Sequence, residues 1–162
     1  MRFLVQPAPE SLERARPPVR VFLAFSALLI LAAVASRAAH GALTPAGLEQ
    51  ILEAVPGERL GPVALWEEVH QGAFLYGFLL LALGSLLAVC PVSRRVRGGL
   101  LWVATAAAFL DLGAPFLPVA FPGFPGWAEL RIGAFLVATC ALLAMAGLAF
   151  STFGREGRPS DG

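Results

Sequence analysis

Lysine is absent from this chain, and charge of either sign is scarce. All twelve basic residues are arginine, eleven residues are acidic, and charged residues make up 14% of the 162 positions. Ordinary soluble domains carry about 25% charged residues, so this composition argues for an integral membrane protein. The formal net charge of +1 gives no strong field for an anionic partner, and we therefore expect no nucleic-acid binding.

Cysteine and the common catalytic motifs are also missing or rare. Cys90 and Cys140 form no Cys-x-x-Cys pair and are too few for a disulfide framework. The P-loop, the dinucleotide-binding glycine motif, the nucleophile elbow and the His-Glu-x-x-His zinc motif are absent. We therefore favour a protein that is not an enzyme, with a metal-dependent membrane enzyme as the weakest alternative.

Hydrophobic residues make up 57% of the sequence and gather in four long runs. Each run comes near the ~20 residues that a helix needs to cross a bilayer, and short connections favour antiparallel neighbours. The predicted fold is an all-α, four-helix transmembrane bundle within residues 21–150. We predict spans at about 21–39, 69–90, 99–117 and 130–150.

Two polar tails flank this membrane domain. Residues 1–20 are rich in proline and arginine, and we predict a loose tail because proline opposes a regular helix. Residues 151–162 form the second tail. The first run could instead be a cleaved signal peptide, since small residues near Ala35 and Ala38 follow a basic start. The long proline-rich leader and the three later spans oppose that alternative.

The first loop, residues 37–64, contains a predicted short external amphipathic helix. Thr44 and Pro45 are typical of an N-cap and the first helical position. Pro56-Gly57 ends the pattern. Glutamates occupy the opposite face, which favours packing across the bundle mouth over docking on anionic lipid. The apolar stripe consists of Leu48, Ile51, Leu52 and Val55.

Arginine counts predict the orientation. Nine arginines lie in the two tails and the 94–97 turn, against three in the opposite loops. The positive-inside rule therefore places both termini in the cytoplasm and the 37–68 and 116–129 loops outside. We predict a multi-pass membrane protein. Tryptophans would then mark both interfaces, with Trp66 and Trp127 outside and Trp102 inside.

Asp111 is the one charged residue well inside a predicted span. At 1.5 Å per residue it lies ~18 Å from the inner end of a ~30 Å core. A bare carboxylate there costs roughly 2.5–3.5 kcal/mol. Pro115 removes the amide that would bond the Asp111 carbonyl. Either the carboxyl group is protonated or hydrogen-bonded in a kinked helix, or it marks a functional site.

His40 and His70 are predicted at the same outer level, and Asp111 in the outer half of its span. Two imidazoles from two helices could hold haem b as axial ligands. Alternatively, His40, His70 and Asp111 could form a two-histidine, one-carboxylate metal site. Glu67 gives His70 the Glu-x-x-His spacing of carboxylate-bridged metal bundles, but those bundles need it twice. The simplest alternative is a polar anchor at the membrane surface.

The outer hairpin alternates prolines with aromatic residues, which are Phe116, Phe121, Phe124 and Trp127. An interfacial anchor is the simplest interpretation, and a contact for a partner subunit or a quinone ring is the alternative. Arg131 follows the hairpin directly. It could snorkel outward, pair with Glu129 or reach Asp111.

Three short motifs resemble a family of small four-helix bacterial membrane proteins of unassigned function. They are His-Gly-x-Leu-Thr-Pro at 40–45, Glu-x-x-His at 67–70 and Leu-Asp-Leu-x-x-Pro at 110–115. The second span of that family usually begins with a His-x-His-Leu-Phe box, and Gly72 replaces the second histidine here. Some members carry an inserted c-type haem domain, which this chain lacks.

The resemblance implies the bacterial inner membrane and a respiratory or electron-transfer setting, and it carries over His40, His70 and Asp111. Our first hypothesis is an accessory subunit of an inner-membrane electron-transfer assembly that contacts haem or quinone at its outer face. The second is a structural or assembly protein without a cofactor, in which these residues form a hydrogen-bonded plug. The bilayer is the expected partner in both, together with subunits of a membrane complex.

Overall fold

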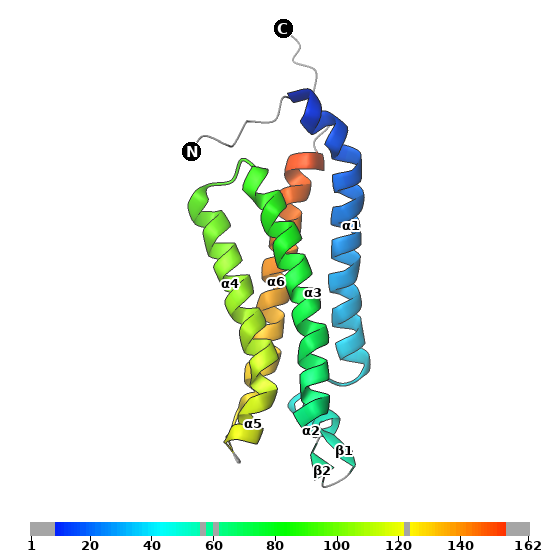
Figure 1. Cartoon of the computed structure of the whole chain (residues 1–162), viewed down its shortest axis with the longest axis vertical. Coiled ribbons are helices and arrows are strands. Elements are labelled where there is room, and N and C mark those ends of the chain that lie inside the picture. Colours follow the sequence, from blue (N-terminus) through cyan, green and yellow to red (C-terminus); the bar gives the residue numbers. More distant parts are fainter. Residues whose placement is uncertain (1–8, 56–57, 60–61, 122–123, 155–162) are drawn as a thin grey trace.

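Four long helices run side by side in an antiparallel bundle (Figure 1). The computed structural model describes residues 9–55, 58–59, 62–121 and 124–154. The predicted all-α four-helix bundle is confirmed. Its long helices are α1 (Pro9–Ala39), α3 (Pro62–Val89), α4 (Arg94–Gly113) and α6 (Trp127–Gly154). The shorter elements are α2 (Pro45–Leu52), β1 (Glu53–Val55), β2 (Glu58–Arg59), the 3-10 turn η1 (Ala114–Phe116) and α5 (Leu117–Ala120).

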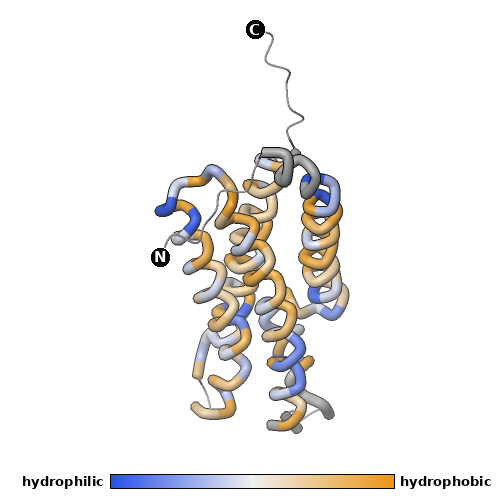
Figure 2. Tube along the Cα trace, turned by 45° about the horizontal axis from the view of Figure 1, so that its top comes forward, coloured by the Kyte–Doolittle hydropathy of each residue, from blue (hydrophilic) through white to orange (hydrophobic). Residues whose placement is uncertain are grey.

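All four long helices are sufficiently long and apolar to cross a membrane. Apolar residues dominate their middle stretches, and hydrophilic residues gather toward the ends (Figure 2). Many large apolar side chains face outward, including Leu81 and Phe109, each 73% exposed. Such a surface fits hydrocarbon, since exposed apolar patches of this size are rare on soluble monomers. The chain is therefore a multi-pass membrane protein.

Helix α1 begins at Pro9, so the prediction of a loose tail is wrong for residues 9–20. Pro17 and Pro18 lie inside this helix, where each removes an N–H donor. The first turns of α1 slant away from the rest of the helix (Figure 1). The apolar span itself starts at Arg16. The two prolines therefore lie about two turns inside α1, at the start of its apolar span, where they remove backbone hydrogen bonds of the helix.

Helix α4 begins at Arg94, five residues before the predicted start at Gly99. Ser93 is its N-cap, with the side chain accepting a hydrogen bond from the Val96 amide at 3.4 Å. The arginines of 94–97 therefore lie in the first turn of a helix, not in a connecting turn. Arg97 reaches back to the carbonyl oxygens of Ala88 (2.7 Å) and Val92 (3.3 Å). It thereby satisfies one acceptor in the last turn of α3, Ala88, and one in the connection to α4, Val92.

The predicted external helix is present as α2, but it ends at Leu52. The stripe position Val55 instead belongs to β1, which pairs antiparallel with β2. Thr44 is the N-cap, because its hydroxyl accepts from the Gly47 amide at 3.1 Å. Leu48 is 1% exposed and packs with a cluster that includes Leu65 and Trp127. Helix α2 therefore covers one end of the bundle.

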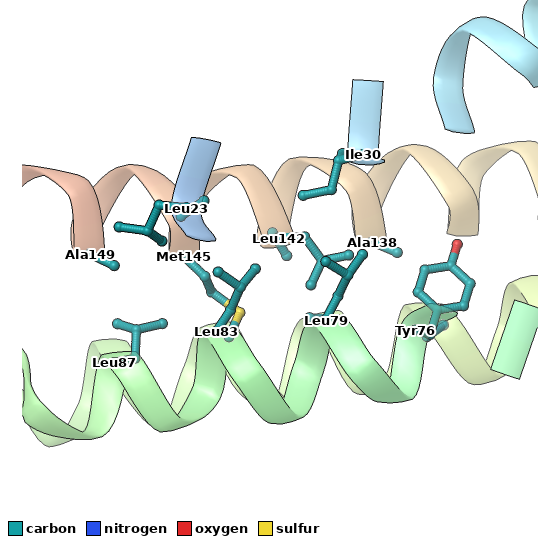
Figure 3. Close-up of a cluster of buried hydrophobic side chains, with 14 of the residues drawn as sticks. Leu23, Ile30, Tyr76, Leu79, Leu83, Leu87, Ala138, Leu142, Met145 and Ala149 are labelled. Atoms are coloured by element: carbon teal, nitrogen blue, oxygen red, sulfur yellow. The ribbon is translucent and has the colours of Figure 1, made fainter. Parts of the chain in front are cut away.

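The bundle core combines leucines of α3 with small residues of α6. Figure 3 shows Leu79, Leu83 and Leu87 pointing toward α6. Facing them are Ala138, Leu142, Met145 and Ala149, all buried. Small residues also let α3 approach α4, since a Cβ added at Gly72 would meet a Leu112 methyl group at 2.5 Å. Helix α6 is the central helix, with half of its span buried.

Candidate functional site

Asp111 of α4 is completely buried and is held by two other helices. Arg37 of α1 donates two hydrogen bonds, one to each carboxylate oxygen, at 2.9 and 2.8 Å. The Tyr76 hydroxyl of α3 donates to Oδ2 at 2.8 Å. Paired hydrogen bonds between a guanidinium and a carboxylate are among the strongest in proteins. The carboxylate in the span is therefore paired with a guanidinium group and a tyrosine hydroxyl.

A second arginine extends this site to the fourth helix. Arg131 of α6 is 3% exposed, and its Nε lies 3.6 Å from Asp111 Oδ1. Its terminal nitrogen donates to Glu68 of α3. The Glu68 side chain is 40% exposed, so the chain of charges ends near the surface of the bundle. We call Arg37, Glu68, Tyr76, Asp111 and Arg131 the charge network.

The charge network is formally neutral, with two arginines and two carboxylates. Neutrality matters because an uncompensated charge in a span is costly. The Arg37 guanidinium also lies 4.0 Å from the ring centroid of Phe135 on α6, a distance typical of a cation–π contact. Helix α6 thus also contacts Arg37, although it contributes no carboxylate to the network.

The network lies toward the bundle end that carries α2 and α5. Arg37, Asp111 and Arg131 are each within about two turns of a helix end at this side. Helix α4 stops at Gly113, and buried Pro115 lies in the 3-10 turn η1 that follows. The Ala114 amide bonds the Leu110 carbonyl. Pro115 therefore marks the end of α4 directly after Asp111.

A cavity of about 330 Å³ borders the network between α1, α3 and α6. Arg37, Glu68 and Arg131 contribute its charged lining, and Ser36 and Gln71 add polar groups. The remaining lining is apolar or small, with Ala33, Val69, Gly72, Leu75 and Leu112. This is a partly polar hollow at the side of a membrane bundle.

The structure does not bring the predicted site residues His40, His70 and Asp111 together as a metal site. Among the described residues, no group of three histidine, cysteine, aspartate or glutamate side chains is placed to hold a metal ion. The physical reason is that both Asp111 oxygens already accept hydrogen bonds from Arg37 and Tyr76. The metal site of His40, His70 and Asp111 stays a prediction, and the geometry of the described residues does not support it.

Both histidines are exposed. His40 Nδ1 lies 2.7 Å from the Ser36 carbonyl oxygen at the end of α1, which fits a polar helix terminus. His70 lies on α3, two residues beyond Glu68. The haem interpretation of these two residues stays a prediction.

The aromatic residues of the hairpin have different environments. Trp127 is buried at 7% exposure, in the cluster with Leu48. The Phe116 ring lies 5.1 Å from the ring of Trp66. Phe121 and Phe124 are 63% and 42% exposed. A partner contact through the two exposed phenylalanines stays a prediction, and Trp127 is a core residue of the bundle end.

Sequence reasoning identified Asp111 but missed most of its partners. Arg131 was expected to pair with Glu129 or reach Asp111; it contacts Glu68 and Asp111. The position of Arg37 at the end of an apolar run could have indicated that it pairs with the carboxylate of Asp111. Tyr76 is the single tyrosine of the chain and was a second signal, since a buried hydroxyl needs a partner.

Comparisons with known proteins agree with this architecture. Searches of curated proteins and of solved structures gave no significant match. A family model described as a transmembrane helical domain matches residues 57–158, which is more than half of the chain and includes α3, α4 and α6. The chain therefore belongs to this transmembrane helical domain family, Aq_1264_TM.

Proposed function

We propose that this protein is a non-catalytic membrane subunit that serves a structural or assembly role. The observation that carries the proposal is the charge network, in which α1, α3, α4 and α6 meet at one buried carboxylate. Hydrocarbon gives little hydrophobic drive between helices, so polar contacts and close packing must select the arrangement. The network supplies that selection at one end of the bundle.

The network acts as a lock on helix register rather than as a reactive centre. Asp111 is fully enclosed, and Arg37 and Tyr76 occupy its oxygens. Buried ion pairs contribute to specificity because a slipped helix leaves a charge unpaired. A bundle locked in this way can present a constant surface to a partner. The exposed Phe121 and Phe124 lie at the same end and offer an aromatic contact.

A photo-crosslinking experiment tests the partner contact. A benzoylphenylalanine would replace Phe121, and the matched control would replace Phe150, which is 53% exposed near the opposite end of α6. A discrete protein adduct from Phe121 in native membranes, absent for Phe150, is the expected result. Equal labelling of lipid alone at both positions would overturn the assembly role of this end.

An accessory role in electron transfer is the second candidate. It is supported by the exposure of His40 and His70, which leaves both imidazoles open to a group shared with another subunit. The inner-membrane location and the cytoplasmic termini belong to the same proposal. It is tested by the pyridine haemochrome spectrum and metal content of protein purified in mild detergent. Stoichiometric haem that is lost on His40→Ala or His70→Ala would favour this candidate; a colourless, metal-free protein would favour the structural one.

A further inference from the structure

We propose that the hollow between α1 and α3 is a binding site for one anionic phospholipid, with its phosphate at the two arginines. The site goes beyond the structural role, because it assigns a ligand to the surface of the bundle. It is built from the cavity of about 330 Å³ and a smaller hollow of about 80 Å³. Both are lined by Ala33, Arg37, Gly72 and Leu75, so they adjoin one another.

The shape of the hollow comes from small residues. Helix α1 packs mainly on α6, and Phe22 meets Phe78 of α3 with ring centroids 6.1 Å apart. This ring contact joins α1 and α3 in the half of the bundle away from the network. In the other half, Ala33 and Gly72 face the gap between these helices and leave it open. A lipid chain can therefore enter sideways from the bilayer.

The polarity of the hollow changes along its length. The larger cavity has Ser36, Gln71 and the charged groups on its lining. The smaller one is lined mostly by apolar side chains, among them Ile30, Leu79 and Leu142. A headgroup at the first and an acyl chain along the second would match this change. The depth also agrees, since Arg37 and Arg131 lie within about two turns of the helix ends, near the interface.

Hydrogen-bond donors of the two arginines select a phosphate group. The side chains that line the larger cavity include two arginines and one glutamate, and the buried Asp111 behind them makes the network formally neutral. The two guanidinium groups have more N–H donors than the network has carboxylate oxygens. Arg131 Nε is buried without a hydrogen-bond acceptor among the described residues. Phosphate oxygens are well suited to such planar donors.

Native mass spectrometry of the detergent-purified chain tests the site. The probes are phosphatidylglycerol, phosphatidylcholine and inorganic phosphate, each added separately. The informative variant is Ala33→Leu, which fills the hollow without touching an ion pair. Its matched control is Ala32→Leu, the same change at an exposed neighbour on α1. We expect one retained phosphatidylglycerol per wild-type chain and about fivefold less in Ala33→Leu, with Ala32→Leu unchanged.

A second variant tests charge independently of packing. Gln71→Glu adds a negative charge to the lining, and we expect about fivefold weaker retention of phosphatidylglycerol. This variant also keeps the proposal testable if Ala33→Leu fails to fold. Equal retention of phosphatidylglycerol and phosphatidylcholine, or equal retention by Ala33→Leu and Ala32→Leu, would overturn the site. Retention of inorganic phosphate in place of lipid would overturn the choice of a phospholipid.

Discussion

Replacing Asp111 by asparagine removes the central charge of the network while keeping the side-chain shape. The substitution leaves Arg37 and Arg131 without the carboxylate that they share. Breaking a buried ion pair by removing one partner typically costs about 3–5 kcal/mol. An unpaired arginine in a span costs roughly 2.5–3.5 kcal/mol on insertion scales. The two estimates meet at about 3 kcal/mol, which is the loss of unfolding free energy that we expect.

Partial exposure of the Arg37 side chain lowers the expected loss of unfolding free energy. The Arg37 side chain is 22% exposed and can recover some hydration, and Phe135 still faces its guanidinium. The Arg131 side chain is 4% exposed, but it keeps its pair with Glu68. We therefore expect a loss near the lower end of the buried-pair range, and not its upper end.

The measurement is reversible unfolding in mixed detergent micelles, followed by tryptophan fluorescence. Trp127 is buried at the same end of the bundle and reports on its opening. The matched control is Glu129→Gln, an exposed carboxylate at the start of α6, for which we expect a change within about 0.5 kcal/mol. In the double variant Arg37→Gln/Asp111→Asn, the loss should fall short of the sum of the single losses by about 1–3 kcal/mol.

Two results would refute the reasoning. Unchanged stability of Asp111→Asn would mean that the carboxyl group carries no charge that its neighbours need. Additive losses in the double variant would mean that Arg37 and Asp111 do not stabilise the fold as a pair.

Three further predictions use the same unfolding assay or a topology reporter. Gly47→Ala should lower the free energy of unfolding by about 1–3 kcal/mol, because the added Cβ would lie 2.1 Å from the Gly41 carbonyl oxygen. Gly77→Ala is the matched control and should leave stability unchanged, because no atom lies within 4 Å of its Cβ position. Arg97→Gln should lower the free energy of unfolding by about 1 kcal/mol, because it removes the hydrogen bonds to the Ala88 and Val92 carbonyl oxygens. The same change at the exposed Arg94 should leave stability unchanged. A C-terminal green fluorescent protein should fluoresce and a C-terminal alkaline phosphatase should stay inactive, since the arginine counts place that end in the cytoplasm. The reverse pattern would overturn the orientation.

The four-helix membrane architecture could be predicted from sequence because hydropathy and length are local properties. An apolar run that exceeds the bilayer thickness has one stable solution, a helix with all of its backbone bonds internal. Helix ends were less accurate. The N-cap of α4 at Ser93 and the helical residues 9–20 were missed, since capping and proline tolerance depend on a few residues whose local preferences compete.

Sequence also singled out Asp111, because a carboxylate inside an apolar run is costly wherever the helix lies. It could not supply the partners. Arg37, Tyr76 and Arg131 come from three other helices, and Arg37 is separated from Asp111 by 74 positions. Which faces meet depends on how small residues such as Gly72 pack against α4, and that is decided only when the helices assemble. The sequence alone thus determined that the long helices lie in lipid and that Asp111 is the carboxylate within them. Tertiary packing decided that two arginines from other helices, Arg37 and Arg131, would compensate that charge.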